Sequence, residues 1–403
     1  MRMNRRSLLT GAAAMAAYGM LGGMTPARAT TTGVIPCAIR WDAWYSQAGN
    51  PRIAQNTLNA NQFHYRAPWF CTEPSSGKVD CTGVQASMDL EIQLAAQAGI
   101  KCFAFDCYLP TLVGGSNDAP MNTGWNLYNA SSYKGLVKWC TIPGGAGVFG
   151  SPSNVWSSND WQASCSWWIP YFAQSNYQTV TVGTSNRPLV YILWNAAHVA
   201  SYFQGLLANV ATAIAYLRTL CAAAGLGNPY VVVLATSGAA ADATAIGADA
   251  ISSYGPLVIN TKLPNSYADL DTATQAFWGT LAASFATIVP DCITGWDRRP
   301  RYNMPETFAE GTLRTFRGNL QYYSTGTPTQ IAAHIQAGIN YIGANPTVCP
   351  SKALLIYSWS ECTEGGTALI PTLGDPPINA ESGQALNTSN LLKAVGPVLR
   401  AAA

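Results

Sequence analysis

From residue 34 onward, short runs of β-branched and aromatic residues alternate with longer segments whose apolar residues recur every three or four positions. The short runs have the composition of buried strands, and the longer segments have the period of amphipathic helices. Strands are predicted at residues 34–41, 101–108, 136–142, 188–194, 230–236, 250–254, 291–296 and 353–359. Helices are predicted between them at residues 88–98, 199–224, 268–287 and 329–342.

This alternation predicts repeated β-α units around a parallel sheet. Eight units in about 370 residues fit one α/β domain, a single (β/α)8 TIM-type barrel with enlarged loops at its C-terminal face. Polar, glycine-containing segments at residues 110–129 and 143–159 are predicted to be such loops. A doubly wound open sheet is the alternative, because the sequence does not show whether the sheet closes.

The first 29 residues have the features of an export signal. Arg5 and Arg6 precede a run rich in alanine, glycine, methionine and leucine, and Ala27-Arg28-Ala29 offers the small residues at which signal peptidase cuts. The arginine pair resembles a twin-arginine signal. We therefore expect residues 1–29 to be a signal peptide and residues 30–403 to be an exported barrel domain, periplasmic or extracellular and free of the membrane. An uncleaved anchor is the alternative.

Charged residues are sparse and balanced, with 22 Lys and Arg against 20 Asp and Glu. This balance gives no reason to expect nucleic acid or an anionic membrane surface as a partner. The chain has 13 Trp and 19 Tyr, which suit an uncharged ligand rich in hydroxyl groups. A sugar ring packs its C–H face on an indole, while carboxylates and amides bind its hydroxyls. A carbohydrate is therefore the expected partner.

Cysteines and histidines give no sign of a metal centre. No Cys-x-x-Cys occurs, and His64, His198 and His334 are far apart in the sequence, so no metal and no other cofactor is expected. All 11 cysteines follow the expected cleavage site, beyond which an oxidising compartment allows disulfides to form. Cys71 and Cys81 bracket a loop-like segment and are the first candidates for a bridge. The odd count leaves at least one cysteine outside an intramolecular pair.

In a (β/α)8 barrel the chemistry lies at the carboxyl ends of the strands. Alternation along the second strand predicts that Asp106 and Tyr108 point into the barrel, and along the last strand it predicts the same for Tyr357, Trp359 and Glu361. The candidates for sugar stacking or hydroxyl binding are Trp41, Asp42, Asp106, Tyr108, Trp296, Asp297 and Trp359. Structural packing or a rim ion pair is the alternative for each of them.

Two glutamates lie three positions apart directly after the last predicted strand, in Ser-Trp-Ser-Glu-Cys-Thr-Glu-Gly-Gly at residues 358–366. In a helical turn, the side chains of Glu361 and Glu364 would stand about 5 to 6 Å apart at Cβ. This spacing suits retaining glycoside hydrolysis, in which one carboxyl group protonates the leaving oxygen and a second, about 5 to 5.5 Å away, acts as nucleophile. Repulsion would separate their pKa values. Solvated acids without a chemical role are the alternative.

Residues 357–371 resemble the Trp-Asn-Glu-x-x-Glu-Gly segment of glycoside hydrolase family 99 and of the related WbsX-like proteins. Residues 40–42, 88–108, 187–191 and 294–301 are similar to the same group in the same order. The resemblance implies a (β/α)8 barrel hydrolase that acts with retention and without a metal. It also implies that Glu361 deprotonates the sugar's own 2-hydroxyl, which attacks the anomeric carbon, and that Glu364 acts as acid and then as base.

The motif differs from the family at three positions. Ser360 stands where the family has asparagine, and Cys362 and Thr363 stand where the mannosidases have aromatic and histidine residues. These differences leave the sugar open, and they leave Asp106 or Asp42 as an alternative nucleophile. The leading hypothesis is an exported, retaining glycoside hydrolase acting on a poly- or oligosaccharide. A non-catalytic carbohydrate-binding or surface protein is the main alternative, and a glycosyltransferase ranks below it because sugar nucleotides are cytosolic.

Overall fold

The computed structural model describes residues 33–42, 44, 53–73, 77–108, 122–143, 160–194, 196–234, 239–255, 265–303, 322–377 and 389–402. All of them belong to one compact unit, Thr31–Ala403. The expected signal peptide, most of both expected loops and the side chain of His198 lie outside the described part.

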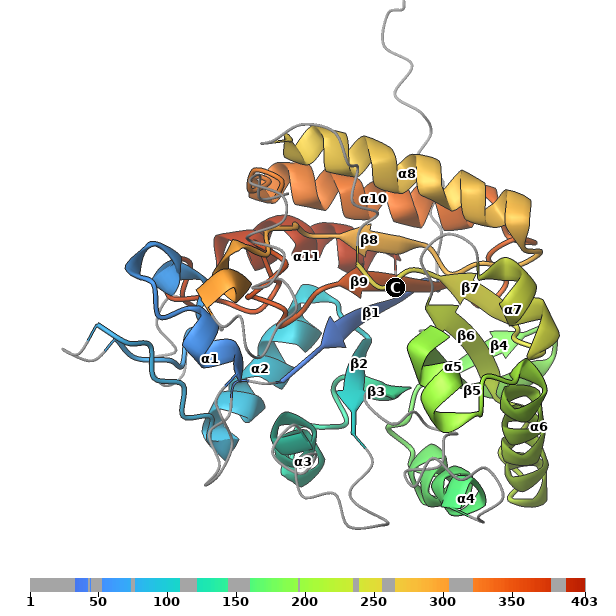
Figure 1. Cartoon of the computed structure of the whole chain (residues 1–403). Coiled ribbons are helices and arrows are strands. Elements are labelled where there is room, and N and C mark those ends of the chain that lie inside the picture. The colour runs from blue at the N-terminus through green and yellow to red at the C-terminus, as the bar shows by residue number, and fades with distance from the viewer. Residues whose placement is uncertain are drawn as a thin grey trace, which may run out of the picture. The chain divides into compact units, whose positions relative to one another are not determined.

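Parallel strands form the wall of a barrel (Figure 1). They are β1 (Ile35–Arg40), β2 (Cys102–Cys107), β3 (Lys138–Pro143), β5 (Ser185–Leu193), β6 (Tyr230–Leu234), β7 (Ala250–Ser252), β8 (Asp291–Ile293) and β9 (Ala353–Tyr357). Neighbours follow the order β7-β6-β5-β3-β2-β1-β9-β8, and a bridge between Ile251 and Ile288 joins the two ends. The expected (β/α)8 barrel is confirmed, and the open sheet is wrong. An unpredicted strand, β4 (Thr179–Val182), pairs antiparallel with β5.

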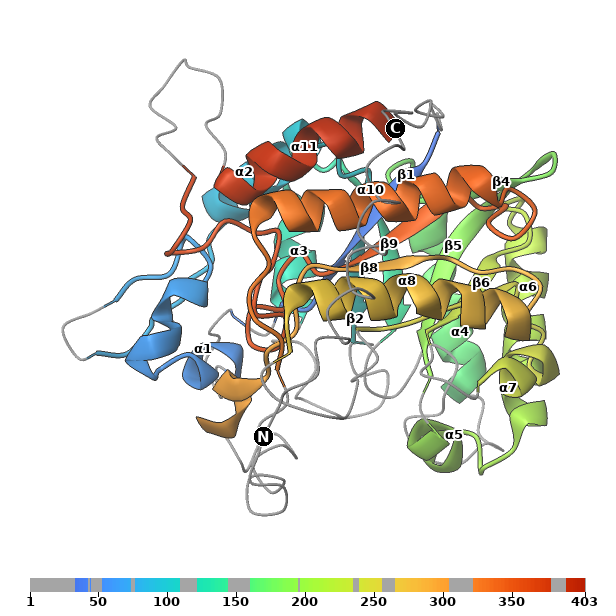
Figure 2. The same ribbon diagram turned by 90° about the horizontal axis from the view of Figure 1, so that it is seen from above.

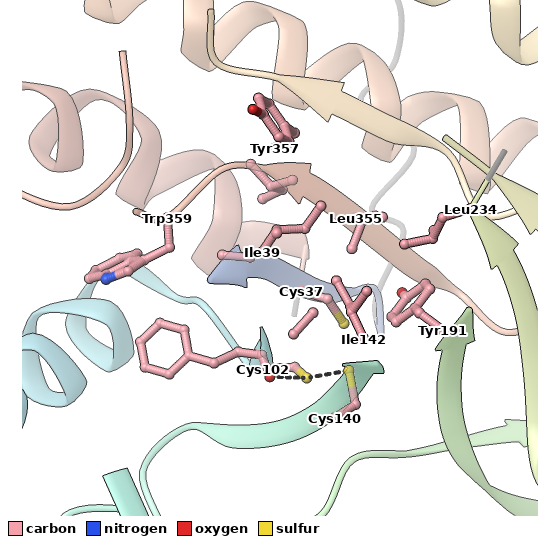
Figure 3. Close-up of a cluster of buried hydrophobic side chains, with 14 of the residues drawn as sticks. Cys37, Ile39, Cys102, Cys140, Ile142, Tyr191, Leu234, Leu355, Tyr357 and Trp359 are labelled. Carbon is pink, nitrogen blue, oxygen red and sulfur yellow. Dashed lines mark hydrogen bonds between the residues drawn. The ribbon is translucent and has the colours of Figure 1, made fainter. Parts of the chain in front are cut away.

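Side chains from several strands fill the barrel interior (Figure 3). Cys37, Cys102, Cys140, Tyr191 and Leu355 come from β1, β2, β3, β5 and β9, and all five are fully buried. The sulfurs of Cys102 and Cys140 lie 3.4 Å apart. Both faces of the strands are apolar because side chains fill the inside and helices cover the outside. The interior is therefore a packed core, and polar chemistry is left to the barrel mouth, which we define as the carboxyl ends of the strands and the segments that follow them.

Helices surround the barrel (Figures 1 and 2). They are α1 (Ile53–Thr57), α2 (Gln85–Ala98), α3 (Thr123–Ala130), α4 (Asp160–Phe172), α5 (Ala196–Tyr202), α6 (Leu207–Ala223), α7 (Ala240–Ala245), α8 (Tyr267–Ser284), α10 (Pro328–Ala344) and α11 (Asn390–Ala402), with 3-10 helices at Asn61–Arg66 and Arg299–Asn303. Helix α11 packs against both α2 and α10. In the part of the chain that the structure describes, no helix combines the length and hydropathy needed to cross a bilayer.

Most helix predictions agree with the structure, and one does not. The single helix predicted over residues 199–224 is two helices, α5 and α6. Gln204 and Gly205 separate them with φ angles of 55° and 72°, and this left-handed conformation interrupts a right-handed helix. The other predicted helices correspond to α2, α8 and α10, and α10 begins at a capping box formed by Thr327 and Gln330.

Helices α3, α4 and α11 have no counterpart among the predictions. Helix α3 occupies the end of the segment at residues 110–129 that was expected to be loop, so that expectation is wrong there. Helices α4 and α11 contain Pro170 and Pro397, residues that usually interrupt helices. Because α11 has a strongly apolar face against α2 and α10, tertiary packing outweighs the local cost of its proline.

The expected disulfide between Cys71 and Cys81 is present, with 4.1 Å between the two Cα atoms. It links the two ends of a short segment between the 3-10 helix Asn61–Arg66 and α2. The remaining nine cysteines are buried thiols. The odd count therefore resolves into one bridge and a set of unpaired cysteines inside the fold.

Candidate active site

Strand β9 ends at Tyr357, and residues 358–366 then form a tight turn at the mouth, which we call the carboxylate turn. The backbone N–H groups of Glu364 and Gly365 donate to the carbonyl oxygen of Glu361 at 3.2 and 2.7 Å, which is the helical turn expected from the spacing. Gly366 has a φ of 70°, and a Cβ there would lie 3.0 Å from Cβ of Asp297. The turn therefore needs glycine at this position.

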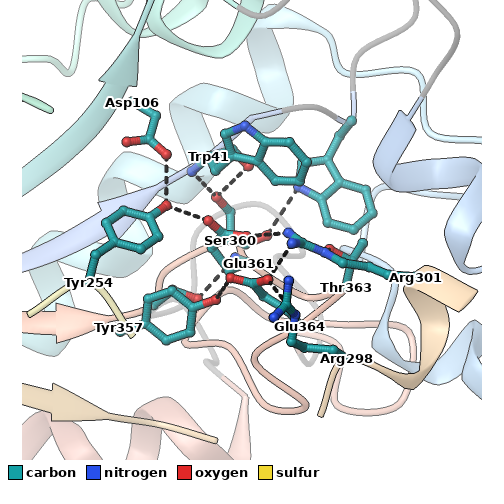
Figure 4. Close-up of polar contacts among 12 residues, drawn as sticks. Trp41, Asp106, Tyr254, Arg298, Arg301, Tyr357, Ser360, Glu361, Thr363 and Glu364 are labelled. Atoms are coloured by element: carbon teal, nitrogen blue, oxygen red, sulfur yellow. Dashed lines mark hydrogen bonds and ion pairs between the residues drawn. The ribbon is translucent and has the colours of Figure 1, made fainter. Parts of the chain in front are cut away.

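Glu361 contacts another side chain through each of its carboxyl oxygens (Figure 4). Oε1 lies 2.5 Å from the hydroxyl oxygen of Tyr254, and Oε2 lies 3.4 Å from Nη2 of Arg301. The side chain is buried, with 2% of the residue exposed. Burial raises the pKa of Glu361 well above its usual value, the charge of Glu364 raises it further, and Arg301 lowers it. Glu361 therefore holds a proton at a pH where a solvated glutamate has lost it.

Glu364 is surrounded by donors. It forms ion pairs with Nη1 of Arg301 and with Nε of Arg298, the second at 3.4 Å, and it accepts a hydrogen bond from the hydroxyl of Tyr357. Only 6% of the residue is exposed. The alternative of two solvated acids is therefore wrong, because both glutamates are enclosed by side chains of other elements.

Arg301 connects the two glutamates. It comes from the 3-10 helix that follows β8, its Nε donates to Oγ1 of Thr363 at 3.3 Å, and its guanidinium carbon lies 5.4 Å from the centre of the Trp41 ring. Although burial opposes its charge, the nearby Glu364 and Glu361 raise the pKa of Arg301. A permanently charged guanidinium is thus held between two acids and one indole.

Asp106 lies at the end of β2, as alternation predicted, and its Oδ2 is 2.7 Å from the hydroxyl oxygen of Tyr254 (Figure 4). Burial raises the pKa of Asp106 to about 8, the contact with Tyr254 lowers it, and the charges of Asp42 and Glu364 raise it. Tyr254 therefore joins two carboxyl groups, Asp106 and Glu361, that come from strands on different sides of β1.

Three of the expected aromatic residues lie at the mouth. The indole N–H of Trp41 donates to the hydroxyl of Tyr108 at 2.9 Å, and the Trp41 backbone N–H donates to Oγ of Ser360 at 3.1 Å. The ring of Trp296 lies 5.9 Å from that of Tyr357, centre to centre. One indole therefore lies near Arg301 and the other near Tyr357, and both of these residues contact the glutamate pair.

Three other expected substrate-binding residues are engaged elsewhere, and the inward orientation predicted for Trp359 is wrong. Its indole is fully buried, donates to Glu91 of α2 at 2.9 Å and packs 5.1 Å from the ring of Phe103. The strand ends two residues earlier, so its alternation does not extend to this side chain. The carboxylate of Asp42 binds Arg40 at 3.0 and 3.1 Å.

Asp297 is likewise taken up by ion pairs. Its carboxylate contacts the guanidinium groups of Arg66 and Arg299, the second at 2.6 and 2.8 Å. Burial opposes its charge, but the two arginines hold the pKa of Asp297 below its usual value. The rim ion pair that the sequence left as an alternative is therefore present here.

Tyr254, Arg298 and Arg301 are the contact residues that sequence reasoning missed. Tyr254 ends a predicted strand, so the same alternation that selected Asp106 could have selected it. The two arginines carried no such signal, because a basic segment after a strand is as compatible with rim ion pairs as with a site. Their approach to Glu364 depends on how the segment after β8 folds back.

A cavity of about 290 Å³ adjoins the far side of the carboxylate turn, and neither glutamate lines it. Its charged lining residues are already engaged. Arg66 binds Asp297, and Asp375 accepts hydrogen bonds from the N-terminus of α11 at Asn390 and Leu391. Among the residues that the structure describes, no group of three or more His, Cys, Asp and Glu side chains is arranged to hold a metal ion.

The fold and the site together define a (β/α)8 barrel with two buried carboxyl groups and indoles at its mouth. Two solved structures of a glycoside hydrolase family 99 endo-α-mannosidase from Bacteroides thetaiotaomicron are similar to it. One, in complex with BIS-TRIS-propane, is 12% identical and the other 13%; each gives a TM-score of 0.51 and covers 92% of this chain and 96% of the mannosidase chain. No protein-family model and no curated protein matches the chain. The resemblance to family 99 is thus confirmed at the level of the fold, a fold that glycoside hydrolases use.

Proposed function

We propose that this chain is a glycoside hydrolase that cleaves a poly- or oligosaccharide with retention, with Glu361 and Glu364 as its catalytic carboxyl groups. The observation that carries the proposal is that Arg301 contacts both glutamates, which are buried at the mouth, while its guanidinium lies near the ring of Trp41. Retaining hydrolysis needs two carboxyl groups close together, and indole faces suit sugar rings. Tyr108 is the remaining polar group there that we propose binds a hydroxyl, whereas the carboxyl group of Asp106 contacts Tyr254.

The surroundings of the two glutamates favour different roles. Burial and a neighbouring charge raise the pKa of Glu361, which suits the general acid. Glu364 accepts contacts from Arg298, Arg301 and Tyr357, which suit an ionised carboxylate acting as nucleophile or as base toward a sugar hydroxyl. This assignment is the reverse of the one that the family resemblance implies.

The test compares Glu361→Gln and Glu364→Gln on a panel of bacterial, fungal and plant polysaccharides, with product sizing. Each variant is expected to lower kcat/KM by about 10²- to 10⁴-fold while remaining folded. Asp291→Asn is the matched control, because it removes an equally buried carboxyl group whose side chain contacts Ser253 and not the carboxylate turn. Near-normal turnover in both variants would contradict the proposal.

Aryl glycosides with good leaving groups separate the two roles, because such substrates do not need a general acid. Glu361→Gln is expected to recover most of its kcat/KM on them, because kcat/KM reports the steps up to release of the leaving group, whereas Glu364→Gln is not. The opposite pattern would restore the assignment implied by the resemblance.

One observation favours a second candidate, a carbohydrate-binding protein without hydrolytic activity. The guanidinium of Arg301 lowers the pKa of Glu361, which opposes its use as a general acid. Glycan binding by calorimetry without product formation over long incubation would support this candidate, and product ladders from any polysaccharide would exclude it.

A further inference from the structure

Tyr254 lies between two carboxyl groups, and this arrangement limits where protons can be. Its hydroxyl oxygen is 2.7 Å from Oδ2 of Asp106 and 2.5 Å from Oε1 of Glu361 (Figure 4). Both distances are those of O–H···O hydrogen bonds. Asp106 and Glu361 are buried, with 7% and 2% of each residue exposed, so no bulk water replaces either contact.

The two contacts need two protons, and the phenol supplies one. Burial raises the pKa of Tyr254 well above its usual value, and the charges of Asp106 and Glu361 raise it further, so the phenol stays protonated. Its single O–H can donate to one carboxyl oxygen only. The other contact is a hydrogen bond only if that carboxyl group carries a proton and donates it to the phenol oxygen. Two ionised carboxylates would leave lone pairs facing each other at hydrogen-bond distance.

The remaining contacts of Asp106 agree with a shared proton. Oδ1 of Asp106 is buried and has no hydrogen-bond partner among the residues that the structure describes, and such an atom is costly to leave on an ionised group. Arg301 contacts Oε2 of Glu361, whereas the phenol contacts Oε1. The other titratable or charged groups around the pair are Asp42, Cys107, Arg301, Tyr357, Cys362 and Glu364.

We propose that Asp106 and Glu361 hold one proton between them through the hydroxyl of Tyr254, and that Asp106 is a positioning residue that keeps Glu361 protonated at the pH of the reaction. The role in catalysis rests on the proposed hydrolase function. With the proton on Glu361, the phenol O–H donates to ionised Asp106, and Glu361 can give its proton to the leaving glycosidic oxygen. A water that later attacks the sugar returns a proton to Glu361, so the pair regains its starting charge.

The variant Asp106→Asn is expected to shift the pH profile in one particular direction. The amide of Asp106→Asn can donate to the phenol oxygen, which forces the phenol O–H of Tyr254 toward Glu361 and stabilises its carboxylate form. The negative charge that opposes ionisation of Glu361 is also lost. We therefore expect the alkaline limb of the kcat/KM profile to move to lower pH in Asp106→Asn, while KM changes little. A merely structural role for Asp106 would lower activity equally at all pH values.

Infrared difference spectroscopy tests the shared proton without any substrate. The full chain, labelled with ¹³C at the aspartate carboxyl groups, is titrated, and the protonated-carboxyl band is compared among the wild type, Asp106→Asn and Tyr254→Phe. The wild type is expected to carry a band that disappears near pH 8 and that both variants alter. Asp291, another buried acid with a raised pKa, contributes equally to all three spectra and cancels.

Two outcomes separate this inference from the proposed function. If neither the labelled aspartate band nor the unlabelled glutamate band of protonated carboxyl groups differs between the wild type and the two variants at any pH, Asp106 and Glu361 share no proton, and the inference is refuted whatever the enzyme does. If the band behaves as expected but no glycan is cleaved, the shared proton is supported and the hydrolase function fails. Asp297→Asn is the control, because its arginine-paired carboxyl group is ionised and its loss should leave the band unchanged.

Discussion

Arg301 shows how single residues set the chemistry of the mouth. Its guanidinium carries one positive charge but contacts two acids, Glu361 and Glu364. A second cation, Arg298, forms an ion pair with Glu364. Glu361 instead lies beside Tyr254 and Asp106, where a proton balances the charge. The neighbours of Glu361 therefore favour its protonated form as general acid, whereas two neighbours of Glu364 are cations.

At this scale, Asp106→Asn is expected to stabilise the folded protein at pH 8 and not at low pH. Burial raises the pKa of Asp106 from 3.8 to about 8. Between these values the folded protein keeps a proton that the unfolded chain has released, so the free energy of unfolding falls as pH rises through this window. Asparagine does not titrate, so the variant gains on the order of 5 kcal/mol at the upper end.

Denaturant unfolding of both proteins at about pH 4 and at pH 8 measures this difference. Asp297→Asn is the matched control, and its stability difference should be nearly the same at these two pH values. Arginine contacts hold the pKa of Asp297 below its usual value, so its contribution is present at neutral pH and is lost as pH falls through that lowered pKa. A stability difference for Asp106→Asn that does not change with pH would refute the prediction.

At the scale of single elements, the carboxylate turn depends on its glycines. Gly366→Ala is expected to cost about 1 to 2 kcal/mol of stability, because alanine is strained at a φ of 70°. Its Cβ would also press on Asp297, which should displace the turn and lower activity. Gly135→Ala is the control, because a Cβ there meets nothing within 4 Å. Equal melting temperatures for the two variants would contradict this prediction.

The strands and their alternation could be predicted because a parallel barrel repeats one local pattern. The pattern placed Asp106 correctly, and it failed at Trp359, which lies beyond the end of β9. Glu361 also lies beyond that end and reaches the mouth through the carboxylate turn. The break between α5 and α6 was missed because Gln204 gives no sequence signal for its left-handed conformation. Arg301 could not be assigned either, because its contacts join segments about 60 residues apart. Local sequence patterns predict where strands end, but contacts from distant segments, such as those of Arg301, are known only from the folded structure.

For the whole molecule, the distribution of charge is more informative than its total. At least seven of the 20 acidic residues are buried, namely Asp42, Glu91, Asp106, Asp291, Asp297, Glu361 and Glu364. Acidic residues are almost never fully buried unless they are paired. All except Asp291 contact the carboxylate turn, directly or through Tyr254. The molecule thus concentrates its costly charges at one end of the barrel, where a reaction would use them.

The export of the whole chain remains a proposal, and it has a direct test. Replacing Arg5 and Arg6 together with lysine is expected to leave the full-length protein in the cytoplasm, because the twin-arginine signal is lost. The wild type should be found in the periplasm or medium with Thr30 as its first residue, as fractionation and intact mass would show. Arg2→Lys is the control. Processing of the double variant at the same position and in the same fraction would count against this route.

The nine buried thiols have a consequence for the lifetime of the protein. A buried sulfur atom does not meet peroxide or a foreign disulfide until the segments around it separate. Oxidative damage would therefore accumulate at the rate at which molecules transiently open, and each modified sulfur would hinder the strands from packing again. The number of oxidised sulfurs in an old sample would then report how often its molecules had transiently opened.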